Sequence, residues 1–124
     1  MAHPQKKYDE PSDTLHISFM PGGSATGIEL NENILLRIDK RERVAVGLSI
    51  FNYSVMAQRT ELGLRSVPLT GLVDLSDELR ELALRILQDA PVRNYLSLLA
   101  YTPGGTAPIP ITHLLPEIVP SQAA

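Results

Sequence analysis

The sequence predicts an α+β fold in which a four-stranded antiparallel β-meander is followed by two C-terminal amphipathic helices packed on one face and an extended proline-rich tail. Three observations predict it: apolar residues alternate with polar ones in the first half, they recur at helical spacing later, and prolines gather near the end. A chain of 124 residues is typical of a single domain. Its expected parts are the meander 8–51, a linker 52–75, the helical pair 76–100 and the tail 101–124.

The first half contains four segments with the period of two that a half-buried strand requires. Turn-forming residues separate them, with Gly22-Gly23 in the first connection, two asparagines in the second and a charged turn in the third. Such short connections favour antiparallel pairing of consecutive strands. The expected strands are Leu15–Phe19, Ala25–Leu30, Ile34–Asp39 and Val44–Ile50.

The second half changes to helical spacing. Ser76 is placed to cap a helix over Asp77–Asp89, and the acids that follow it suit the positive end of the helix dipole. Pro91 favours the start of a second helix, Pro91–Ala100. Residues 53–64 could begin with a helical turn and 66–71 read as extended. The tail is extended, with at most one short turn at 113–117.

Composition argues against several classes of function. The net charge is −3 and there is no run of Lys or Arg, so nucleic-acid binding is not expected. With no cysteine the chain has no disulfide, thiolate nucleophile or cysteine zinc site, which fits a cytoplasmic protein. The N-terminal residues do not form a signal peptide, and no apolar run is long enough to span a membrane, so no membrane partner is expected.

A group of residues in the first half carries a family resemblance. These are Tyr8-Asp9, Asp13 before the first strand, Glu29 in the second, the segment Ile34–Asp39, and Val46-Gly47. The pattern resembles domain-of-unknown-function family number two thousand two hundred and eighty-three, whose members are small bacterial β-meander proteins. The resemblance covers about residues 8–51 and implies the sheet but no activity.

This sequence departs from that family at three places. His16 stands where an aromatic residue is usual, the turn Lys40–Arg43 lacks the usual glycine, and Ser49 replaces a typical glutamate.

The acids beside the first strand, together with His16, suggest a possible acid–base or metal site. Metal binding needs several converging ligands, yet no two histidines are spaced to share a strand or helix face. Asp9 and Asp13 lie in a loop before the strand, where Asp side chains commonly bond to nearby backbone N–H groups. No serine has a nucleophile-elbow setting and no glycine pair fits a phosphate loop. We therefore expect no catalytic residue, no metal ligand and no cofactor.

The remaining candidate is an interaction surface on the sheet face opposite the core. Strand alternation places apolar residues on this nominally solvated face, which indicates a binding patch. Its predicted residues are His16, Met20, Leu35, Arg37 and Phe51. Open sheet edges and the apolar stretch 107–111 of the tail, which could cover its own helices or a partner subunit, are further sites for contact with another chain. The sequence thus predicts a non-enzymatic, self-associating protein–protein interaction module that forms a homo-oligomer.

Two alternatives stay open. In the first, His16, Arg37 and an acid from Asp9 or Asp13 line a small-ligand pocket between the sheet and the tail. In the second, the chain is an antitoxin-like protein that binds a small basic protein partner, an idea that comes from the gene neighbourhood of some family members.

Overall fold

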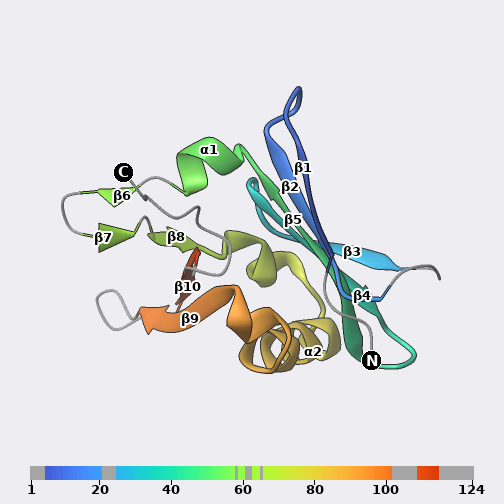
Figure 1. Cartoon of the computed structure of the whole chain (residues 1–124). Helices are drawn as coiled ribbons and strands as arrows, with labels where there is room; N and C mark the ends of the chain where they lie inside the picture. The colour runs from blue at the N-terminus through green and yellow to red at the C-terminus, as the bar shows by residue number, and fades with distance from the viewer. Residues whose placement is uncertain are drawn as a thin grey trace.

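The computed structural model confirms an α+β chain built on an antiparallel sheet, here of five strands (Figure 1). It describes residues 5–20, 25–57, 59–60, 63–64, 66–101 and 109–114. Figure 1 shows the five-stranded sheet on the right, a smaller three-stranded sheet on the left, and helix α2 below them.

The five-stranded sheet contains all four predicted strands and one more. Its strands are β1 (Gln5–Asp9), β2 (Thr14–Ser18), β3 (Thr26–Asn31), β4 (Ile34–Asp39) and β5 (Val44–Phe51). The additional strand β1 is exposed along most of its length, so its sequence shows no apolar alternation. It forms because the turn at residues 10–13 folds it back antiparallel onto β2.

The strand order β1-β2-β5-β4-β3 corrects the predicted meander. Strands β3, β4 and β5 do pair consecutively, but β2 lies beside β5 instead of β3, which is a Greek-key arrangement. The physical reason is burial. Leu15 and Ile17 of β2 pair with Ile50 and Leu48 of β5, and all four side chains are buried. The most apolar strands therefore occupy the middle, while β3 stands at an edge with Glu29 exposed.

The second half of the chain has more structure than a linker, two helices and a tail. Its elements are α1 (Tyr53–Met56), β6 (Arg59–Thr60), β7 (Gly63–Leu64), β8 (Ser66–Pro68), the 3-10 turn η1 (Thr70–Asp74), α2 (Asp77–Gln88), the 3-10 turn η2 (Val92–Asn94), β9 (Leu96–Tyr101) and β10 (Ile109–Leu114). The predicted first helix is confirmed as α2, and the Ser76 hydroxyl accepts the Leu79 N–H at 3.2 Å, as a cap does.

The predicted second helix over 91–100 is wrong. The segment makes only the η2 turn and then enters β9, which pairs with β10 along its whole length. A short apolar run fits a strand as well as a helix, and pairing with a distant segment decides between them. That distant segment is the predicted tail, of which residues 109–114 form the centre of the sheet β8-β10-β9. Residues 102–108 and 115–124 of the tail lie outside the described residues.

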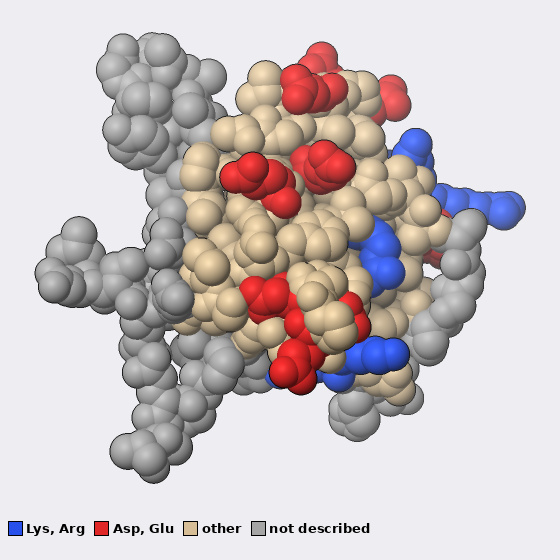
Figure 2. Space-filling model, turned by 90° about the horizontal axis from the view of Figure 1, so that it is seen from above, with Lys and Arg blue, Asp and Glu red and all other residues tan. Residues whose placement is uncertain are grey.

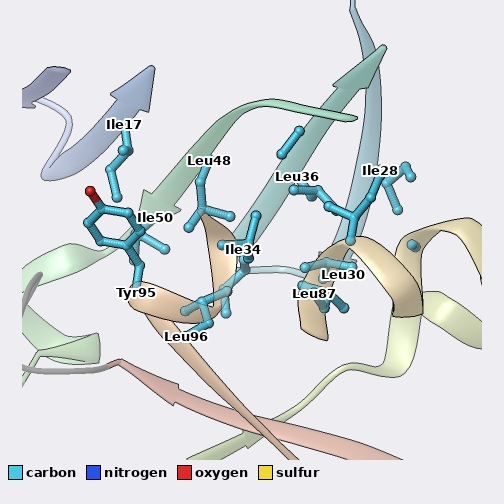
Figure 3. Packing of buried hydrophobic residues seen from close by; sticks show 14 of the residues in the cluster. Ile17, Ile28, Leu30, Ile34, Leu36, Leu48, Ile50, Leu87, Tyr95 and Leu96 are labelled. Carbon is cyan, nitrogen blue, oxygen red and sulfur yellow. The ribbon is translucent and has the colours of Figure 1, made fainter. Parts of the chain in front are cut away.

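One hydrophobic cluster joins the described parts (Figure 3). Leu87 of α2 and the neighbouring residues Tyr95 and Leu96 face the inner side of the five-stranded sheet, and each is at most 7 % exposed. Phe19 and Tyr95 stack with ring centroids 5.7 Å apart. The inner face of the sheet is thus fully used by the core, and its outer face is left for other contacts. No helix among the described residues is long and apolar enough to cross a membrane.

Candidate interaction face

The outer side of the five-stranded sheet, called the open face below, is organised in cross-strand rows. In one row His16, Ser49, Leu35 and Glu29 are directly paired across β2, β5, β4 and β3. In the next, Ser18, Gly47, Arg37 and Gly27 are paired in the same way. Strand alternation puts Thr14 and Phe51 on the same side. The open face consists of Thr14, His16, Ser18, Gly27, Glu29, Leu35, Arg37, Gly47, Ser49 and Phe51, with Lys7 of β1 beside His16.

Four of the five residues that alternation predicted for this surface lie on it. His16, Leu35, Arg37 and Phe51 are all half-buried there. Met20 lies elsewhere: it is 45 % exposed and lines a hollow beside α2. Strand β2 ends at Ser18, so its alternation does not extend to Met20, and the Val46 carbonyl accepts the N–H groups of both Phe19 and Met20, at 2.8 and 3.2 Å.

His16 is tied to its cross-strand neighbour. Its Nδ1 atom and the Ser49 Oγ atom share a hydrogen bond of 2.9 Å. Ser49 is only 2 % exposed, and no acid is hydrogen-bonded to His16 in the described part of the chain. A serine acts as a nucleophile only where a substrate can reach its hydroxyl and a third group orients the base. The pair therefore anchors the histidine ring, which is the cross-strand role that its position predicts.

Arg37 lies across the backbone of Gly47. A Cβ atom added at Gly47 would come within 2.5 Å of the Arg37 Nη2 atom and 3.0 Å of its Cζ atom, so the missing side chain makes the space for the guanidinium. The Nε atom of Arg37 is buried and has no hydrogen-bond partner among the described residues. A buried donor without an acceptor is unfavourable. The free energy would therefore be lowered if a new acceptor came within hydrogen-bond distance of the Arg37 Nε–H.

The acidic group before β2 has a different role. The Asp13 carboxylate accepts hydrogen bonds from the Tyr8 hydroxyl at 2.6 Å, the Ser54 hydroxyl at 2.6 Å, and the Ser54 N–H at 3.1 and 3.2 Å. The Tyr53 N–H donates to the Asp13 carbonyl at 2.9 Å. Asp13 therefore fastens the N-terminus of α1 to the β1–β2 hairpin. Asp13 lies in the turn before β2, as predicted, but the backbone N–H that it binds belongs to Ser54, 41 residues away, and not to the nearby loop that local spacing suggests.

These hydrogen bonds shift the pKa values of both Asp13 and Tyr8. Bonds from Ser54, and then from Tyr8, stabilise the charged carboxylate and lower the pKa of Asp13. The bond to Asp13, with a smaller effect of burial, raises the pKa of Tyr8 to about 12. Asp9 is not in the loop as predicted: it is the last residue of β1, paired with Thr14, and its carboxylate accepts a hydrogen bond from the Ser12 hydroxyl.

The structure does not bring the predicted ligand residues together. Asp13 is committed to α1, whereas His16 and Arg37 lie on the open face. No group of three or more His, Cys, Asp or Glu side chains within the described ranges is placed to hold a metal ion. Of the other histidines, His3 lies outside the described residues, and only the backbone of His113 is described, in β10.

Charge is unevenly distributed on the surface. Figure 2 shows the molecule from above, with Asp and Glu spread across the view and Lys and Arg gathered toward its right-hand side. The view offers no broad basic surface of the kind that binds a phosphate backbone.

Comparison with known proteins gives one match. A family model described as "Protein of unknown function (DUF2283)" matches residues 6–54, which confirms the resemblance. The matched segment holds nearly all of the five-stranded sheet, the whole open face, and Tyr8, Asp13 and Ser54 of the α1 attachment. No curated protein and no solved structure matches the chain.

Proposed function

We propose that the chain is a non-enzymatic, cytoplasmic interaction module that self-associates through its open face. The observation that carries this is the composition of that face. Half-buried Leu35 and Phe51 lie beside the small residues Gly47 and Ser49 of the central strand. Arg37 lies over Gly47, and its Nε atom is buried and has no partner among the described residues. Arg and aromatic residues are enriched in protein interfaces, and apolar residues that stay partly accessible on one sheet face mark a contact site.

The edges of the sheet are less suited to self-association. The β3 edge is covered by η1, where a Cβ atom added at Gly71 would lie 1.8 Å from the Glu29 carbonyl oxygen. No described strand pairs with the β1 edge, but this edge carries exposed Lys6 and Lys7, and lysine on an edge strand opposes pairing with another chain. The open face is the remaining large surface of the sheet.

The strand order supports a specific dimer. Because β5 is the central strand, a two-fold axis parallel to β5 and just above the open face would place β1 of one copy over β3 of the other. In the row of His16, this pairs Lys7 with Glu29 of the second copy, twice in the dimer. Gly47 and Ser49 would lie at the axis, with the Arg37 guanidinium lying over Gly47 and filling the space between two sheets at the usual ~10 Å separation.

The remaining features of the proposal have separate support. A non-enzymatic role fits the engagement of His16, Ser49 and Asp13 in structural hydrogen bonds. A cytoplasmic location fits a chain without cysteine. The half-polar composition of the open face indicates a dissociation constant on the order of micromolar instead of an obligate dimer.

Charge exchange tests the dimer. Sedimentation across a concentration series should show a monomer–dimer equilibrium for the wild-type chain. Lys7→Glu and Glu29→Lys should each weaken the dimer about tenfold, because each puts two pairs of like charges face to face. The double variant Lys7→Glu/Glu29→Lys should restore it, since opposite charges then face each other again.

Two glycines in the same row provide a matched control. Gly47→Ala displaces the Arg37 guanidinium at the axis and should weaken the dimer, whereas the Cβ of Gly27→Ala meets only Leu35 at 3.4 Å, an ordinary contact, and should not. A wild-type chain that stays monomeric at all concentrations overturns the proposal, including the case in which a different protein binds this face. Failure of the double variant to regain the dimer overturns the proposed arrangement.

A further inference from the structure

A hollow of about 330 Å³ lies beside the C-terminal half of α2, away from the open face. Its apolar lining comes from Phe19, Met20 and Ala45 at the end of the sheet and from Ile86 of α2. Two arginines, Arg43 and Arg85, also line it. Binding sites for small molecules commonly combine an apolar lining of this kind with a few charged groups that fix the orientation of the ligand.

Arg43 is held in an unusual backbone conformation. It ends the turn between β4 and β5 with φ of 60°, and its N–H donates to the Asp39 carbonyl at 2.7 Å. The left-handed region is unfavourable for a residue with a Cβ atom, and glycine adopts it freely. The chain thus has an arginine at a turn position where glycine would be the less strained residue. Backbone strain of this kind often accompanies a functional side chain.

Neither arginine of the hollow is engaged by another residue in the described part of the chain. Within the described residues, the guanidinium groups of Arg43 and Arg85 make no hydrogen bond or ion pair. Arg80 is the contrast, because it donates to the carbonyls of Leu72, Val73 and Leu75 and pairs with Asp77 at 3.0 Å.

The charges of the hollow favour an anion. Asp89 is the one acid among its lining residues, so the two arginines leave an excess of positive charge. A neighbouring hollow that also includes Arg43 is lined by Lys40 and Glu78, whose opposite charges offset each other.

We propose that this hollow binds a small organic acid with an apolar body. The hydrocarbon part of the ligand packs on Phe19, Met20 and Ile86, and its carboxylate accepts hydrogen bonds from Arg43 and Arg85. The site uses none of the open-face residues, so the test of ligand binding is independent of the test of the dimer.

Naphthoate, an aromatic carboxylate, is the probe, and the uncharged naphthalene carboxamide is its control. Naphthoate should raise the melting temperature of the wild-type chain in a concentration-dependent way, because a ligand that binds only the folded state stabilises it. The carboxamide should have a much smaller effect, since it has the same apolar body without the charge. Amide NMR signals of Val44, Ala45 and Ile86 should shift on addition of naphthoate.

Three variants connect the response to the arginines. Arg85→Gln should weaken naphthoate binding about tenfold, as expected for the loss of a charge-assisted hydrogen bond. Arg43→Gly should do the same and also raise the melting temperature of the unliganded chain, because it relieves the left-handed strain. Arg93→Gln removes an exposed arginine that does not line the hollow and should change neither quantity.

The two readouts separate a binding role from a structural one. A variant that is more stable alone and binds less well cannot have lost binding through unfolding. Equal shifts with naphthoate and its carboxamide, or equal affinity in the wild-type chain and both hollow variants, would overturn the proposal. Absence of any naphthoate response in the wild-type chain would overturn it as well.

Discussion

At the scale of single residues, Asp13 explains how a four-residue helix is held in place. A helix as short as α1 is not stable alone, and its N-cap residue, Asn52, makes no side-chain capping bond. The carboxylate of Asp13, 41 residues before Ser54 in the sequence, takes the place of the missing cap. Hydrogen bonds from Tyr8 and Ser54 orient this carboxylate. The short stretch of acids before β2 is thus a structural joint between the hairpin and α1.

We predict that this joint loosens in acid. Because the folded state lowers the pKa of Asp13, its contribution to stability is present above the pKa of the unfolded chain, near 4, and is lost as pH falls through the lower folded value. Asp13→Asn should therefore destabilise the chain at neutral pH, and the difference from wild type should shrink as the pH is lowered below about 4. Urea unfolding at several pH values measures this. A constant difference across that range would contradict it.

The same joint should respond to alkali through Tyr8. Its folded pKa of about 12 exceeds the unfolded value of 10, so its contribution is complete below pH 10 and is lost as pH rises toward 12. Burial also raises the pKa of Tyr53, so tyrosinate absorbance should show more than one late-titrating tyrosine in the wild-type chain, including a late titration of Tyr8. That titration should move to lower pH in Asp13→Asn, because the negative partner of the phenol is removed.

At the scale of elements, sequence patterns predicted the strands and the helix whose formation depends on neighbouring residues. Alternation located four strands of the five-stranded sheet, and a cap followed by a 3.6-residue repeat located α2. Strand β1 has no such pattern, because an edge strand buries little. The segment 91–100 has a helical repeat too short to resist pairing with β10. The same alternation placed His16, Leu35, Arg37 and Phe51 on the open face and failed at Met20, which lies beyond the end of β2 at Ser18.

Docking of η1 on the β3 edge provides a prediction at this scale. The Cβ of Gly71→Ala would lie 1.8 Å from the Glu29 carbonyl oxygen and 2.9 Å from its carbon, so either η1 or the β3 backbone must move. We expect a loss of about 1–3 kcal/mol in the free energy of unfolding. Thermal and urea unfolding measure it, with Gly27→Ala as the control glycine in the open part of β3. An unchanged stability would show that η1 does not rest on this edge.

At the scale of the whole molecule, the five-stranded and three-stranded sheets share one core. The second sheet brings Ser66–Pro68 against residues 111–113, a pairing between segments more than forty residues apart that only the complete fold determines. Its strand β9 begins with Leu96, which is 2 % exposed and belongs to the same cluster as Ile34 and Ile50 of the five-stranded sheet. Distant pairing of this kind leaves no local signature, so sequence patterns described the tail as merely extended.

A shared core predicts one cooperative unfolding unit. Leu96→Ala opens a cavity in that cluster and should cost about 2–5 kcal/mol. Native-state hydrogen exchange should then lose protection by the same free energy at amides of β5 and of β9, although the change lies in the second sheet. Leu98→Ala, at a partly buried position of the same strand, is the matched control and should cost less. If β9 lost protection while β5 kept it, the two sheets would unfold as separate cooperative units.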